Sequence, residues 1–173
     1  QRPQFMYKIE TYSCHYDFGE DRIHLIGNAQ KRNERMDFWL TRRMVIVLLG
    51  HGMTLLEKTD PLTPSVPLNE QQHFHSLQHK SAVASTELQS QKIETLNSTP
   101  ILMNKVDIKT HRNHFEWIIY NETDQKIAFS TLKRNEMHAI FNMIIHFSKQ
   151  AHWNLEPLVK KWNEKSATPD KVH

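Results

Sequence analysis

The stretch RMDFWLTRRMVIVLLGHGMTLLEK, residues 35–58, joins a strand to a helix and decides the fold. Met36, Phe38 and Leu40 alternate with Arg35, Asp37 and Trp39, which is typical of a strand with one buried face. Thr41 follows directly and is a residue type that caps helices, so the pattern predicts a helix from this point onward.

The predicted helix has a run of apolar residues, 44–49, that covers every side of it. We therefore expect Val45, Val47 and Leu48 all to be buried, under more than the sheet that precedes them. Gly50 and Gly52 each weaken a helix by about 1 kcal/mol relative to alanine. Their presence indicates either close packing or an early end of the helix.

The same order of elements occurs a second time. The first copy has the strand-like runs FMYKIETYSCHYD (5–17), RIHLIGN (22–28) and RMDFWL (35–40) before its helix. The second has ILMNKVDIKT (101–110), HFEWIIYN (114–121) and KIAFSTL (126–132), followed by the helical KRNEMHAIFNMIIHFSKQAHW (133–153). Few residues are identical, so the repeat is a match of pattern. We predict an α+β fold of two pseudo-repeated β-β-β-α units, residues 1–58 and 100–153, built from antiparallel meanders around a shared core.

The segments outside the repeats are a polar middle, 59–99, and a short end, 154–173. Pro61, Pro64 and Pro67 interrupt any helix at the start of the middle segment, and a polar helix is predicted after them. Its sparse apolar positions leave a mobile arm and a docked helix as alternatives. The end segment is predicted to be an amphipathic helix and a loose tail. Its apolar positions, which are candidates for binding a partner, are Leu155, Leu158, Val159 and Trp162.

Composition limits the function further. The 173 residues carry a formal net charge of only +3, which does not imply a strong field for nucleic acid. Cys14 is the sole cysteine, so we expect no intrachain disulfide and a cytoplasmic location. The longest apolar run is too short for a bilayer, so we expect no membrane association.

Few patterns in the chain point to catalysis. With only 4 glycines, neither a P-loop nor a dinucleotide-binding fingerprint can be assembled, and we expect no cofactor. Cys14 and His15 are neighbours on a strand and face opposite sides, which favours a structural cysteine. His75 and His79 share a helical face and are weak candidates for a metal site. No other ligands complete the set, so we predict no metal.

Basic and aromatic residues gather near the ends of predicted strands. The candidates for binding nucleic acid are Lys31, Arg32, Arg35, Arg42, Arg43, Trp39, Lys133 and Arg134. Aromatic side chains beside cations can stack unpaired bases and hold phosphates. In outline the arrangement resembles the Whirly and PUR single-strand-binding proteins, which also repeat a sheet-then-helix unit. Those families have four or more strands per repeat, and no residue role is carried over from them.

Two functional hypotheses of different class follow. The first is a non-catalytic protein-interaction or assembly subunit that binds a protein partner or itself. The second is a protein that binds single-stranded nucleic acid. A metal-dependent enzyme that uses the histidine cluster is a third hypothesis, and we expect that the protein is not an enzyme.

Overall fold

The computed structural model of the chain describes residues 6–84 and 98–163. In the first part lie β1 (Tyr7–Lys8), β2 (Tyr12–Asp17), β3 (Arg22–Gly27), β4 (Met36–Leu40), α1 (Arg42–Thr59), the 3-10 turns η1 (Thr63–Ser65) and η2 (Leu68–Glu70), and α2 (Gln71–Ala84). In the second lie β5 (Ile101–Leu102), β6 (Lys105–Thr110), β7 (Phe115–Tyr120), β8 (Lys126–Leu132), α3 (Arg134–Gln150) and α4 (Glu156–Asn163). The predicted α+β class is confirmed. Four strands precede α1 and four precede α3, and the first strand of each set has only two residues.

The strands form two four-stranded sheets, with the orders β2-β3-β4-β5 and β1-β8-β7-β6. The three longer strands of each unit, β2-β3-β4 and β6-β7-β8, form antiparallel meanders, as predicted. The fourth strand of each sheet is parallel to its neighbour and belongs to the other unit, since β5 pairs with β4 and β1 pairs with β8. The two units therefore exchange their leading strands.

This exchange divides two segments that the sequence pattern presents as single strands. Residues 5–17 and 101–110 were each predicted as one strand, but each supplies a short strand to one sheet and a longer strand to the other. The chain passes from one sheet to the other between β1 and β2 and again between β5 and β6, and we call these two points the crossings. At the first, the Ile9 amide donates to the Phe129 carbonyl at 2.9 Å. At the second, the Met103 amide donates to the Trp39 carbonyl at 3.0 Å. Ile9 and Met103 are both buried in the core. A common origin of the two units by duplication stays a prediction.

Asn28 and Gly27 hold the first crossing. The buried Asn28 side chain accepts from the Glu10 amide at 2.9 Å and donates to the Lys8 carbonyl at 2.9 Å. A Cβ at Gly27 would lie 2.8 Å from Cγ2 of Ile9, so the chain passes over this position only because it is glycine. The crossing is thus fixed by side-chain hydrogen bonds and by close packing.

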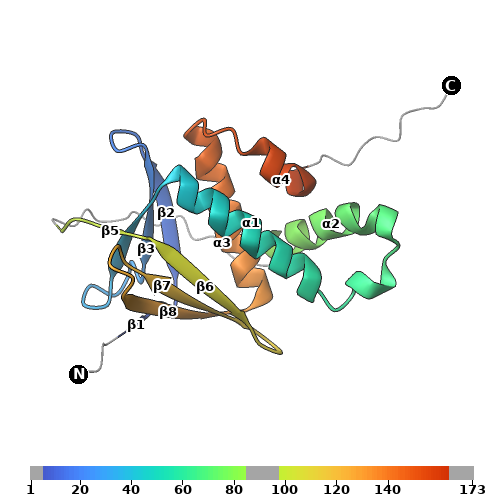
Figure 1. Ribbon diagram of the computed structural model, residues 1–173, viewed down its shortest axis with the longest axis horizontal. Helices are drawn as coiled ribbons and strands as arrows, with labels where there is room; N and C mark the ends of the chain where they lie inside the picture. Colours follow the sequence, from blue (N-terminus) through green and yellow to red (C-terminus); the bar gives the residue numbers. More distant parts are fainter. Residues whose placement is uncertain (1–5, 85–97, 164–173) are drawn as a thin grey trace.

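The two long helices also pack across the two units. α3 packs on β2 and β3 of the first unit, while α1 packs on β6 of the second unit as well as on β4. Trp117 of β7 stacks on Phe141 of α3, with ring centroids 5.8 Å apart. Residues from both sheets and from α1, α3 and α4 form one hydrophobic core. Figure 1 shows the sheets on one side of the molecule and α2 and α4 on the other.

The structure of α1 corrects one prediction and confirms another. Thr41 caps the helix, because the Met44 amide donates to its Oγ1 at 3.2 Å. Val45 and Leu48 are buried, but Val47 is 58% exposed, so the prediction that all three are buried was wrong. The helix faces the core with one stripe and presents Val47 to solvent.

Gly52 is a site of close packing, whereas Gly50 is not. A Cβ at Gly52 would lie 2.2 Å from Cζ of Phe141, and one at Gly50 would lie 3.6 Å from Cδ1 of Leu158. We expect Gly52→Ala to lower the free energy of unfolding by about 2 kcal/mol, since overpacking against a stacked ring outweighs the gain in helix propensity. Gly50→Ala should raise it by up to about 1 kcal/mol. Urea unfolding of both variants checks this pair, and an equal effect of the two substitutions would contradict it.

The described part of the middle segment contains the predicted polar helix as α2, Gln71–Ala84. α2 packs against α3 and α4, and His75, Ser76 and His79 are its buried side chains. The predicted continuation of this helix beyond residue 84 and the predicted tail beyond residue 163 lie outside the described residues. Across 6–84 and 98–163, no helix is long and apolar enough to cross a membrane.

Candidate functional site

Arg35 and Arg134, both predicted to bind nucleic acid, contact other residues of the protein through their guanidinium groups. Arg35 forms an ion pair with Asp37, with Nε 2.8 Å from Oδ1, and only 3% of the Arg35 side chain is exposed. Arg134 donates to the Leu56 carbonyl at 2.8 Å and to Thr59 Oγ1 at 2.6 Å. Arg134 thereby ties the start of α3 to the last turn of α1.

The other basic candidates lie on separate parts of the surface. Lys31 is paired with Glu10 and Glu34, in the connection between β3 and β4 that also carries Arg32. Arg42 donates through Nε to the Trp153 carbonyl at 3.0 Å. The exposed Arg43 lies beside it in α1, and the exposed Lys133 precedes α3. The set is divided between a loop and the starts of two helices, and binding of nucleic acid stays a prediction.

Trp39 lies within a polar network on the outer face of β2, β3 and β4. Its ring packs on His24 with centroids 5.1 Å apart, and His24 in turn contacts His15. His24 Nε2 lies 2.7 Å from Asp37 Oδ2. Burial raises the pKa of Asp37, but hydrogen bonds from Arg35 and His24 outweigh this effect and hold the pKa below its ordinary value. His24 of β3 thus links β2 through His15 and β4 through Asp37 and Trp39.

The weak metal candidates are part of the packing between α2 and α3. His75 and His79 are buried, and His79 Nδ1 lies 2.8 Å from Nδ1 of the buried His138. One nitrogen of this pair must donate and the other accept, which requires that the accepting ring is neutral. Burial lowers the pKa of His79 to about 4 and that of His138 to about 3. In the described residues, no three His, Cys, Asp or Glu side chains are grouped to hold a metal ion.

Cys14 and the apolar face of α4 also lie within the core. Cys14 is buried on the inner face of β2, and burial raises the pKa of its thiol to about 12. Leu155 and Val159, predicted to bind a partner, are buried in the core, and Leu158 packs against it. Trp162 belongs to α4, and its side chain is outside the described residues. The chain itself therefore covers the described part of the apolar face of α4.

An exposed apolar segment connects α1 to α2. Residues 61–69, here called the proline–leucine loop, read PLTPSVPLN and contain no charged side chain. Leu68 is 88% exposed and Leu62 is 54% exposed. From the sequence alone, the three prolines were interpreted only as helix breakers. A charge-free run with a proline at every third position was the signal that could have identified the loop as a surface.

Hydrogen bonds from both neighbouring helices hold the proline–leucine loop in one shape. The Leu62 amide donates to Oδ1 of Asp60 at 3.0 Å, and Thr63 Oγ1 donates to the Glu57 carbonyl at 2.9 Å. On the other side, Gln71 Nε2 donates to the Val66 carbonyl at 3.1 Å. Pro64 lies within η1, so the loop is bent there. The loop therefore presents its leucines on an ordered backbone.

Comparisons of the chain with models of protein families, with curated proteins and with solved structures found no match. The outline resemblance to the Whirly and PUR proteins thus has no support from a structural match. Each sheet does have four strands, but the fourth comes from the other unit. A function can therefore be inferred only from the residues of this chain.

Proposed function

We propose that the protein is a non-catalytic protein-interaction subunit and that the proline–leucine loop is its binding surface. The observation that carries this proposal is the exposure of Leu62 and Leu68 in a charge-free loop with an ordered backbone. Burying a leucine side chain fully is worth about 1.5–3 kcal/mol. Two leucines of one loop can therefore provide a substantial part of the free energy of binding to a partner.

The chemistry of the loop defines its partner. A surface with prolines, leucines and no charge complements an apolar groove on another protein rather than a phosphate backbone. Because the loop is already held by Asp60, Glu57 and Gln71, it loses little conformational entropy on insertion. Among the candidate basic residues, Arg35, Arg42 and Arg134 contact the protein itself.

An affinity capture tests the proposal. Tagged protein and the double variant Leu62→Ser, Leu68→Ser are incubated with native extract, and the retained proteins are identified by mass spectrometry. We expect a partner that the original protein retains and the double variant loses, while both have the same melting temperature. Phe18→Ser is the matched control, because Phe18 is 87% exposed in the hairpin between β2 and β3. Equal retention by all three proteins, or retention of nothing, would refute the loop as the binding surface.

A further inference from the structure

The corner between α3 and α4 contains a pocket of about 240 Å³. Its floor consists of buried side chains, namely Ile145, Ser148, Leu155 and Val159. Three of these are aliphatic, and the hydroxyl of Ser148 donates to the Ile144 carbonyl of its own helix at 2.7 Å. The floor is therefore largely apolar and suits a branched hydrocarbon group.

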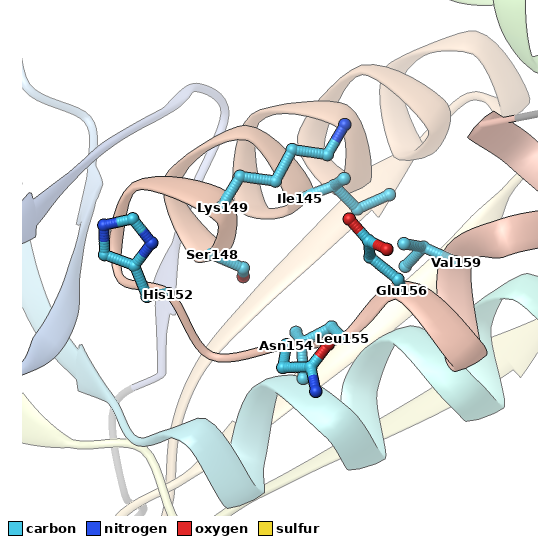
Figure 2. Close-up of a pocket in the computed structure, with 8 residues that line it drawn as sticks. All are labelled: Ile145, Ser148, Lys149, His152, Asn154, Leu155, Glu156 and Val159. Atoms are coloured by element: carbon cyan, nitrogen blue, oxygen red, sulfur yellow. The ribbon is translucent and has the colours of Figure 1, made fainter.

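The rim of the pocket carries charges of both signs. Lys149, His152, Asn154 and Glu156 line it and are exposed. Figure 2 shows Lys149 of α3 and Glu156 of α4 on the same side of the pocket, with His152 on the other side. No ion pair joins Lys149 to Glu156 among the described interactions of the protein. A cation and an anion thus border one small apolar pocket.

The turn that forms one wall is held in place. The Trp153 amide donates to the Ser148 carbonyl at 3.2 Å and the His152 amide donates to the Lys149 carbonyl at 3.1 Å, which closes α3 in a Schellman motif. Trp153 also donates through Nε1 to Asp21 Oδ1 at 3.1 Å and accepts from Arg42. The wall is therefore preformed, as in most sites for small ligands.

His152 occupies the position of the Schellman motif at which glycine is usual. Its φ is 55°, and that of Asn154 is also 55°. Asparagine tolerates this left-handed region, but a histidine there costs about 1 kcal/mol relative to glycine. A histidine at this position places an imidazole on the rim of the pocket, where the backbone conformation favours glycine.

We propose that the pocket binds a free aliphatic α-amino acid of the size of valine or leucine. The ligand's ammonium group contacts Glu156, its carboxylate contacts Lys149, and its side chain enters among Ile145, Leu155 and Val159. A pocket of about 240 Å³ is larger than one water needs and smaller than the usual site for a drug-sized ligand, which favours a small ligand. This site is separate from the proline–leucine loop, so either proposal can fail without the other.

Titrations followed by NMR of the side-chain methyl groups test the site with three probes. L-leucine has both charged groups, isovalerate lacks the ammonium group, and 3-methylbutylamine lacks the carboxylate. We expect saturable shifts at the methyls of Ile145, Leu155 and Val159 with leucine, and weaker binding of the other two probes. Glu156→Gln should weaken leucine and the amine by about tenfold and leave isovalerate unchanged, because it removes only the contact with the ammonium group.

Lys149→Met should have the reverse selectivity. It should weaken leucine and isovalerate by about tenfold and leave the amine unchanged. Lys80→Met is the matched control, because Lys80 is exposed on α2 and does not line the pocket. The proposal is overturned if leucine gives no saturable shift at millimolar concentration. It is equally overturned if the two rim variants weaken all three probes alike or none of them.

Discussion

Lowering the pH from about 7 to about 5 should cost the protein about 4 kcal/mol of unfolding free energy through His79 and His138, about 2 kcal/mol from each. Their pKa values in the folded protein are about 4 and about 3, mainly because both rings are buried. In the unfolded chain a histidine has a pKa of about 6.5 and takes up a proton first. Since the unfolded state then binds more protons, stability falls as the pH falls from about 6.5 toward about 4.

Protonation has a direct structural consequence at this pair. The contact of 2.8 Å between the two Nδ1 atoms needs one donor and one acceptor, and once both rings are protonated the pair has no acceptor. The loss should therefore be concentrated where α2 packs on α3. Urea unfolding at a series of pH values measures this loss of stability in the original protein and in the double variant His79→Gln, His138→Gln.

A second histidine of the same helix provides the control for this prediction. His73 is exposed on α2, so His73→Gln should keep the pH dependence of the original protein. The double variant should have a flatter dependence, whatever its stability at neutral pH. The same loss between about pH 7 and about pH 5 in the double variant as in the original protein would show that other groups control acid unfolding.

Leu48→Ala should lower the free energy of unfolding by about 2–5 kcal/mol, because it leaves a cavity that the packed core cannot close. Leu48 is 2% exposed and lies in the core that both units share. Val47→Ala, one residue away, should change stability by no more than about 0.5 kcal/mol, since Val47 is exposed. Thermal and urea unfolding of both variants give the comparison. Equal losses would mean that α1 is buried on all sides in solution.

The strands and helices of this fold could be predicted from the sequence better than the pairing of the strands into sheets. Alternation identified the buried face of β4, where Phe38 and Leu40 are buried and Met36 is partly buried. The exchange of β1 and β5 could not be predicted, because a strand's alternation is the same whichever sheet it joins. Val47 was assigned wrongly for a related reason. An apolar run specifies no direction, and the direction is set by what packs against the helix.

The candidate sites were harder to predict, because residue type does not reveal whether a side chain faces solvent. Arg35 and Arg134 fit a phosphate-binding pattern, yet their partners Asp37 and Leu56 are supplied by the fold. The pocket between α3 and α4 depends on the left-handed backbone at His152, which carries no glycine to mark it. Only the proline–leucine loop had a signal in the sequence itself.

Photo-crosslinking from the proline–leucine loop tests most directly whether this loop binds a protein partner. A benzophenone amino acid is placed at Leu62 or Leu68, both exposed, and at Thr131 as a control on the exposed surface of β8. After irradiation in native extract, we predict that Leu62 and Leu68 each give an adduct with the same protein and that Thr131 does not. Absence of any protein adduct at Leu68 beyond that at Thr131 would contradict the proposed interaction surface. An adduct with a second copy of this chain would identify self-association as the interaction.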